Sequence, residues 1–368
     1  MKKKRITSIL GAAALTAAMT LSCMPVMAED YAPIAGTTTT FDKYLEMDQD
    51  ANVPNASFTF TVAEGTAEGD VLAGVGADQV TMTDQDTTTD GYQLVFAPGD
   101  STKNKEGDTT KKIATKTATV DFSQCSFTEP GVYRYVLTES GANQAVTNDA
   151  ALTRNLDVYV IDKEGVLEIG GYFLHAGENK SYGFTNTYDT SNLTISKTVT
   201  GNQGSRDKYF KFTVEIKNAV AGTRYDVDLT NAEQNPVNNA GTSYTNMTNP
   251  ATITAGSDGT VITYFYLKHG QSIVIKGLAK ETTFKVTEEE ENYTPSVEVD
   301  GVKTEKSNTT NDKTVASADI TAAYTNDRTG NIPTGVLMTV TPFAVLTLLG
   351  GFGAAKIVMK KRREDGEE

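Results

Sequence analysis

Short runs in which apolar and polar residues alternate recur along most of the chain. In residues 57–62, for example, Phe58, Phe60 and Val62 occupy every second position, and residues 210–216 repeat the pattern. Because successive side chains of a β-strand point to opposite faces, each run predicts a strand with one buried face. Clusters of Gly, Asp and Asn separate the runs and predict turns, and no long amphipathic pattern indicates a helix.

The predicted strands form two groups, joined by a short connector at residues 189–192. The first group comprises residues 57–62, 92–96, 118–122, 132–137, 155–161 and 167–169, and the second comprises 210–216, 223–229, 261–267, 272–276, 283–286 and 296–299. We expect the charged residues 101–116 to form an exposed loop or hairpin and the Asn-rich residues 231–249 to form a loop. The strands predict an all-β fold of two tandem Ig-like β-sandwich domains, residues 41–189 and 190–328.

Three polar residues interrupt the apolar rows in the same order in each half of the chain. They are Lys43, Glu139 and Asn186 in the first half, and Lys197, Glu288 and Asn326 in the second. Each falls two positions from a large apolar or aromatic residue, which places it on the core face of its predicted strand. Since lysine and glutamate are rarely buried without a partner, the repeated order indicates a shared chemical role.

A crosslink between lysine and asparagine would explain the repeated triplet. A neutral lysine amine can attack the side-chain amide of asparagine and release ammonia if a nearby acid polarises the carbonyl. Burial favours both conditions, because it lowers the pKa of a lysine and raises that of a carboxyl group. Each residue alone has an ordinary explanation, a solvated lysine or a turn asparagine, but two matching triplets favour the crosslink.

Both ends of the chain indicate export. Residues 1–28 combine a basic start, an apolar run and a final Ala28, as in a secretory signal peptide cut after that residue. Residues 29–40 are polar and predict an extended lead-in. Near the other end, residues 336–355 are apolar over a length that could span a bilayer, and the charged residues 356–368 would stay in the cytoplasm. Taken alone, this end predicts a permanent membrane anchor.

A short element before the apolar run, within residues 329–335, gives a second interpretation. Its order, with Pro333, Thr334 and Gly335 followed by an apolar span and a basic tail, resembles a sortase sorting signal. In such signals a cysteine transpeptidase cuts between the Thr and the Gly, here Thr334 and Gly335, and joins the Thr to an amine. The commonest form is Leu-Pro-any-Thr-Gly. Here Asn331 and Ile332 stand in place of Leu and Pro, a variation associated with pilin-polymerising sortases.

Composition narrows the function classes. The chain has 33 basic and 47 acidic residues, of which 24 basic and 43 acidic remain when residues 1–28 and 335–368 are left out. The resulting formal net charge of −19 disfavours nucleic acid as a partner. Cys125 is then the single cysteine, so no internal disulfide can form. The two histidines, His175 and His269, show no triad or metal-ligand spacing, so we expect no metal, no cofactor and no enzyme acting on external substrates.

With the two triplets and the sorting signal, residues 41–335 resemble the major shaft pilins of Gram-positive bacteria, in particular the two-domain streptococcal type. The resemblance implies self-formed isopeptide bonds from Lys43 to Asn186 and from Lys197 to Asn326. It also implies that Glu139 and Glu288 are the catalytic carboxyls and that each bond joins the first and last strands of its domain. Closing the first loop would contribute about 5 kcal/mol in the chain-entropy picture. Mechanical tension applied to the first strand would then pass through the bond to the last strand.

Shaft pilins of this type also need a surface lysine that receives the Thr of the next subunit. Lys180, shortly before the predicted closing strand of the first domain, best fits that place, and Lys163 is a less favoured alternative. The implied partners are a pilin-type sortase, further copies in a head-to-tail fibre, tip and basal pilins, and peptidoglycan. The sequence therefore predicts a structural subunit of a cell-surface pilus. A monomeric, sortase-anchored adhesin is the alternative, and an acceptor lysine would distinguish the two.

Overall fold

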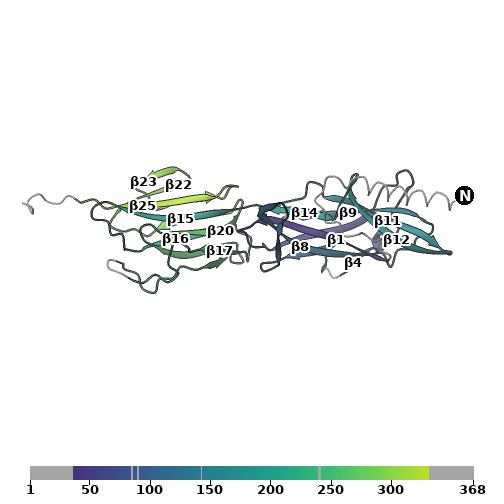
Figure 1. The fold of residues 1–368 in the computed structure, drawn as a ribbon, viewed down its shortest axis with the longest axis horizontal. Helices are drawn as coiled ribbons and strands as arrows, with labels where there is room; N and C mark the ends of the chain where they lie inside the picture. The colour runs from purple at the N-terminus through teal and green to yellow at the C-terminus, as the bar shows by residue number, and fades with distance from the viewer. Residues whose placement is uncertain (1–35, 84–85, 89–90, 142, 239–241, 331–368) are drawn as a thin grey trace, which may run out of the picture.

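The chain folds into two β-sandwich domains that lie end to end along the long axis of the molecule (Figure 1). This is a computed structural model, and it describes residues 36–83, 86–88, 91–141, 143–238 and 242–330. Apart from a short 3-10 helix, η1 (Ala77–Gln79), every regular element in these residues is a strand. The predicted all-β fold of two tandem Ig-like sandwiches is confirmed. The predicted signal peptide, sortase cleavage site, apolar span and charged tail lie outside the described residues.

The first domain contains two sheets that face each other. One sheet has the order β10 (Val146–Thr147), β14 (Gly183–Tyr188), β1 (Thr38–Asp48), β8 (Asp108–Asp121) and β4 (Thr81–Thr83), with β7 (Thr102–Lys105) paired to β8. The other has the order β13 (Asn179–Lys180), β12 (Val166–Ala176), β11 (Thr153–Lys163), β9 (Gly131–Ser140), β2 (Ala56–Glu64), β6 (Gly91–Phe96) and β5 (Asp86–Thr88), with β3 (Val71–Ala73) paired to β9.

The second domain repeats this two-sheet arrangement. Its larger sheet has the order β18 (Thr252–Thr254), β17 (Arg224–Asp228), β20 (Ser272–Ala279), β15 (Thr190–Thr200), β25 (Ile320–Asp327), β22 (Thr294–Val299) and β23 (Val302–Glu305). Its smaller sheet has the order β19 (Val261–Leu267), β16 (Phe210–Lys217), β21 (Thr283–Glu288) and β24 (Lys313–Thr314).

In each domain the first and last long strands are neighbours. β1 pairs in parallel with β14, and β15 pairs in parallel with β25. Most other pairs are antiparallel. These two parallel pairs join the parts of each domain that lie farthest apart in sequence. The approach is close where β14 begins, because a Cβ added at Gly183 would lie 1.7 Å from the carbonyl oxygen of Asp42. Only glycine fits at that position.

Three details of the fold differ from the predictions. β1 begins at Thr38, so residues 38–40 belong to the first domain and not to a lead-in, and only Asp189 separates β14 from β15. Residues 101–116 do form a hairpin, β7 and β8, but β8 is a central strand that pairs with all of β1. The inner row of β8 includes Ala114, Lys116 and Ala118, which are too small or too polar to reveal apolar alternation. In the described part of residues 231–249 no strand forms, as predicted.

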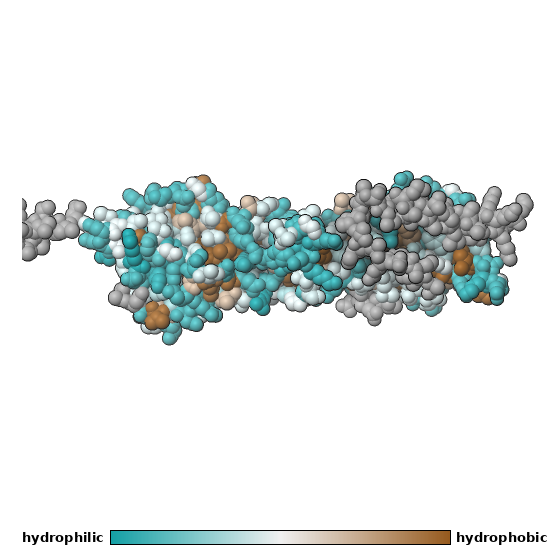
Figure 2. Space-filling model, in the orientation of Figure 1, coloured by the Kyte–Doolittle hydropathy of each residue, from teal (hydrophilic) through white to brown (hydrophobic). Residues whose placement is uncertain are grey.

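Each domain has its own core of aromatic and β-branched side chains between its two sheets. The outer surface seen in Figure 2 is mostly hydrophilic, with apolar residues in small groups. No helix in the described residues has the length and apolar character needed to cross a bilayer.

The domains meet through the loop between β1 and β2. In that loop the carboxylate of Asp50 accepts a hydrogen bond from Asn192 at 3.1 Å and forms an ion pair with Lys276 at 3.2 Å. Val220 and Ala279 of the second domain pack into the core of the first. The end-to-end arrangement in Figure 1 is thus supported by both polar and apolar contacts.

Candidate functional site

The structure brings the first predicted triplet together in the core of the first domain. Lys43 on β1 pairs with Phe184 on β14, so Asn186, two residues farther along β14, lies on the same face and diagonally opposite the lysine. Glu139 reaches this pair from β9 in the facing sheet. All three side chains are buried, with residue exposures of 0%, 2% and 0% for Lys43, Glu139 and Asn186. The alternating pattern therefore placed each residue on the correct face.

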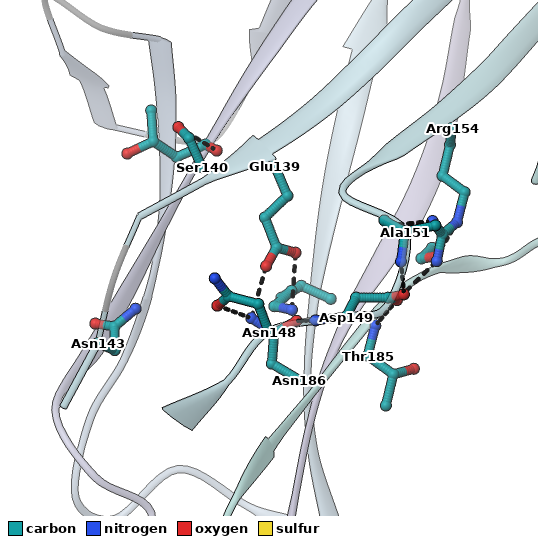
Figure 3. Close-up of polar contacts among 12 residues, drawn as sticks. Glu139, Ser140, Asn143, Asn148, Asp149, Ala151, Arg154, Thr185 and Asn186 are labelled. Carbon is teal, nitrogen blue, oxygen red and sulfur yellow. Dashed lines mark hydrogen bonds and ion pairs between the residues drawn. The ribbon is translucent and has the colours of Figure 1, made fainter. Parts of the chain in front are cut away.

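In this first site the carboxylate of Glu139 contacts both of the other members. Its Oε2 lies 2.8 Å from Nζ of Lys43. Its Oε1 accepts a hydrogen bond from Nδ2 of Asn186 at 2.6 Å (Figure 3). The same Nδ2 also donates to Asn148 at 3.2 Å, and Oδ1 of Asn186 accepts from the backbone N–H of Asp149 at 3.0 Å. The amide of Asn186 is held by contacts on both of its polar atoms.

The second domain repeats the arrangement with the same register. Lys197 on β15 pairs with Tyr324 on β25, and Asn326 follows two residues later. From β21 of the facing sheet, Glu288 accepts hydrogen bonds from Nζ of Lys197 at 2.8 and 2.9 Å. Nδ2 of Asn326 donates to Oε1 of Glu288 at 2.5 Å, the same oxygen that Lys197 contacts. All three side chains are again buried.

Both lysines lie against aromatic rings that exclude water. Nζ of Lys43 is 4.3 Å from the ring centre of Phe58, and Nζ of Lys197 is 4.3 Å from that of Phe210. Burial lowers the pKa of Lys43 and of Lys197 from 10.5 to about 8, although the neighbouring glutamates act in the opposite direction. Burial also raises the pKa of Glu288, more than its contacts with Lys197 and Asn326 lower it.

The first site includes a supporting loop that the sequence analysis missed. Asp149 accepts hydrogen bonds from the backbone N–H groups of Thr185 and Ala151 and pairs with Arg154 at 2.7 Å (Figure 3). Burial would raise the pKa of Asp149, but these hydrogen bonds outweigh it and lower the pKa. The loop thereby fixes the backbone N–H that contacts Asn186. In sequence Asp149 is an ordinary turn residue, because its partners are distant or carry no pattern.

These two sites contain the groups needed for amide exchange. Each has an amine with a lowered pKa, an amide electrophile on the neighbouring strand and a carboxyl group that contacts both in a water-excluded core. Attack of Nζ on Cγ of the asparagine would form a C–N bond, break the bond to Nδ2 and release ammonia. The carboxyl group would move the protons. Within the described residues, no group of three or more His, Cys, Asp or Glu side chains could hold a metal ion.

The remaining predicted residues lie apart from these sites. Lys180 is exposed on β13, and its Nζ lies 4.7 Å from the ring centre of Tyr182. Lys163 is exposed at the end of β11 and pairs with Glu168 at 3.3 Å. Thr334 and Gly335 fall outside the described residues.

Comparison with known proteins gives matches over both domains. Residues 39–189 match the family described as Spy0128-like isopeptide containing domain, and residues 191–328 match a domain of unknown function, DUF7601. A pilin of Streptococcus pyogenes serotype M1 is 29% identical over 348 residues, which cover 89% of this chain and 92% of that protein.

Solved structures give the same result. The crystal structure of the major pilin from Streptococcus pyogenes is 26% identical and superposes with a TM-score of 0.55, covering 81% of this chain and 100% of that one. A glutamate-to-alanine mutant of a major pilin from the same organism is 25% identical, with a TM-score of 0.54 and coverage of 80% and 100%. By sequence and by fold, this chain is similar to the major pilins of Gram-positive bacteria.

Proposed function

We propose that this chain is the structural subunit of a covalently polymerised cell-surface pilus, with each domain stiffened by a self-formed isopeptide bond. The bonds would join Lys43 to Asn186 and Lys197 to Asn326. The observation that carries this proposal is that one buried glutamate contacts both the lysine and the asparagine in each domain. The chain would need no cofactor and act on no external substrate, because each reaction occurs once, within its own domain.

The intact mass of residues 29–334, combined with peptide mapping, tests the bonds. The expected mass is short by two ammonia molecules, with crosslinked peptides that join the two named pairs. An unmodified mass would remove the basis for self-formed bonds. The chain would then remain a pilin relative whose sandwiches are held by noncovalent packing alone.

Polymerisation would proceed through Thr334 and a surface lysine. A pilin-type sortase would break the Thr334–Gly335 peptide bond, hold the Thr334 carbonyl as a thioester on its cysteine and transfer it to a lysine amine. That transfer would form an amide and return the thiol. Lys180 is the proposed acceptor because it is exposed on β13, immediately before β14. The same proposal includes export by the signal peptide, the joining of tip and basal pilins, and final attachment to peptidoglycan.

Replacement of the acceptor lysine tests polymerisation and separates it from the alternative function. Lys180→Ala should abolish the ladder of high-mass polymers, while Lys163→Ala, on a neighbouring hairpin of the same sheet, should leave it intact. The opposite pattern would assign the acceptor to Lys163. A chain that is sortase-anchored but forms no ladder even with both lysines present would be a monomeric adhesin.

A further inference from the structure

A buried histidine lies in the hairpin that presents Lys180. β12 ends at Ala176, the chain turns through Gly177, and β13 returns alongside, with His175 directly opposite Lys180 in the antiparallel pair. Residues opposite each other in such a pair point to the same face of the sheet, with Cβ atoms about 5 Å apart. His175 is 7% exposed, whereas Lys180 is exposed. The histidine thus lies next to the proposed acceptor, one strand farther into the sheet.

Both ring nitrogens of His175 face oxygen atoms that can only accept a hydrogen bond. Nδ1 lies 2.5 Å from the carbonyl oxygen of Gly177 in the turn, and Nε2 lies 3.2 Å from Oδ2 of Asp157 on β11. Asp157 is ionised, because Arg134 donates to its two oxygens at 2.8 and 2.9 Å. A neutral imidazole has a single N–H and cannot satisfy both acceptors. Only the imidazolium form of His175 makes both hydrogen bonds.

The anion that contacts the ring favours this form, although two cations stand close by. Asp157 approaches from β11, Arg134 lies beyond it on β9, and Lys180 stands opposite on β13. The hydrogen bond to Asp157 is the main cause that raises the pKa of His175, and Arg134 opposes it only weakly. The ring also stacks on Phe173, with centroids 5.2 Å apart and an angle of 22° between the planes.

We propose that His175 is a positioning residue for the acceptor amine of Lys180. As an imidazolium it ties the turn at Gly177 to β11, and the short strand that carries Lys180 is held in place by that turn. Loss of the proton removes one of the two hydrogen bonds and loosens the hairpin. Attachment of the next subunit at Lys180 would therefore be most efficient when His175 is protonated. This inference rests on the proposed role of Lys180 in polymerisation.

The test compares His175→Gln with the unmodified chain in ligation by a pilin-type sortase, using residues 29–334 as the acceptor. The ratio of the two ligation rates cancels the pH dependence of the sortase and of the lysine amine. At mildly acidic pH we expect the unmodified chain to be ligated about fivefold faster than His175→Gln, which corresponds to the free energy of one hydrogen bond. This advantage should fall towards one as the pH rises through the pKa of His175. His269→Gln is the matched control. Nδ1 of His269 accepts from the backbone N–H of Val199 in the second domain, so its ratio should stay near one at every pH.

The outcomes separate this inference from the proposed function. If Lys180→Ala abolishes ligation but His175→Gln ligates like the unmodified chain at every pH, the positioning role is wrong and the acceptor assignment stands. If Lys180→Ala leaves ligation unchanged, both are wrong.

A spectroscopic measurement tests, without any variant, the clamp formed by the hydrogen bonds from the His175 ring to Asp157 and Gly177. The imidazole ¹⁵N shifts of His175 in the unmodified chain should show two protonated nitrogens and a titration above the usual value of about 6.5. A single protonated nitrogen at mildly acidic pH would overturn the clamp even if the variants failed to fold.

Discussion

The two triplet sites share their strand register but differ around the asparagine. In the first domain the carbonyl oxygen of Asn186 accepts a hydrogen bond from the backbone N–H of Asp149. In the second, no donor among the described residues reaches the carbonyl oxygen of Asn326. The lysines differ as well, because Lys197 donates to both oxygens of Glu288, whereas Lys43 lies beside one oxygen of Glu139 without hydrogen-bond alignment. The same chemistry can thus be supported by two different sets of contacts.

The difference suggests how each asparagine would be polarised. In the first domain a fixed backbone donor would share the developing negative charge with the carboxyl group. In the second, Glu288 contacts Nδ2 of Asn326 and not its carbonyl oxygen, so no such donor is in place; the raised pKa of Glu288 would still leave a proton available for transfer. The following predictions test this comparison, beginning with the largest expected effect.

Removal of either proposed crosslink should give the largest change in stability. Asn186→Ala and Asn326→Ala should each lower the free energy of unfolding of their own domain by about 5 kcal/mol, because each opens a loop of more than about 100 residues. Calorimetry would follow the two domains, and peptide mapping would show the bond that remains. Equal melting of crosslinked and uncrosslinked domains would mean that the bonds do not constrain the unfolded chain.

The pH dependence of bond formation should be alike in the two domains. Only a neutral amine can attack, and the pKa of both Lys43 and Lys197 is about 8. The rate should therefore rise about tenfold per pH unit below that value and level off above it, provided that the carboxyl group stays protonated. The measurement is the mass of chains sampled during folding at a series of pH values. A midpoint near that of a solvated lysine, about 10.5, would contradict burial of the amine before reaction.

The supporting loop should matter in one domain alone. Asp149→Ala removes the acceptor that fixes residues 149–151, so the backbone N–H beside Asn186 would lose its fixed position. We expect the Lys43–Asn186 bond to form about tenfold more slowly, with no change in the Lys197–Asn326 bond, which serves as the internal control. Time-resolved peptide mapping of newly synthesised chains would measure both rates together. Equal slowing in both domains would show a general folding defect.

The domain interface should give the smallest effect. Asp50→Ala removes the ion pair with Lys276 and the hydrogen bond from Asn192, both of which are partly exposed. Such contacts contribute about 1 kcal/mol or less. Thermal unfolding should shift slightly, while the masses of both crosslinked domains stay unchanged. A large loss of stability would mean that the domains depend on each other more than their separate cores suggest.

The sequence predicted the burial of the triplet residues better than it predicted their surroundings. Lys43 and Glu139 were placed on the core face because strand alternation is a local property. Asp149 and the clamp of His175 with Asp157 were missed, because their partners come from other strands and loops. β8 was only partly predicted, since Lys116 interrupts its inner row and forms an ion pair with Asp100. Local pattern thus predicts which side chains are buried, and folding decides which of them meet.

The parallel pairing of the first and last strands would also set the order of events during synthesis and the proposed export. Lys43 would emerge early, but its proposed partner Asn186 lies on β14, so the first site would stay incomplete until nearly the whole domain had left the ribosome and crossed the membrane. Contacts between residues so distant in sequence form late in folding. No crosslink could form on a partly exported chain and block its passage. A closed bond would instead record that the domain has been completely translocated and folded.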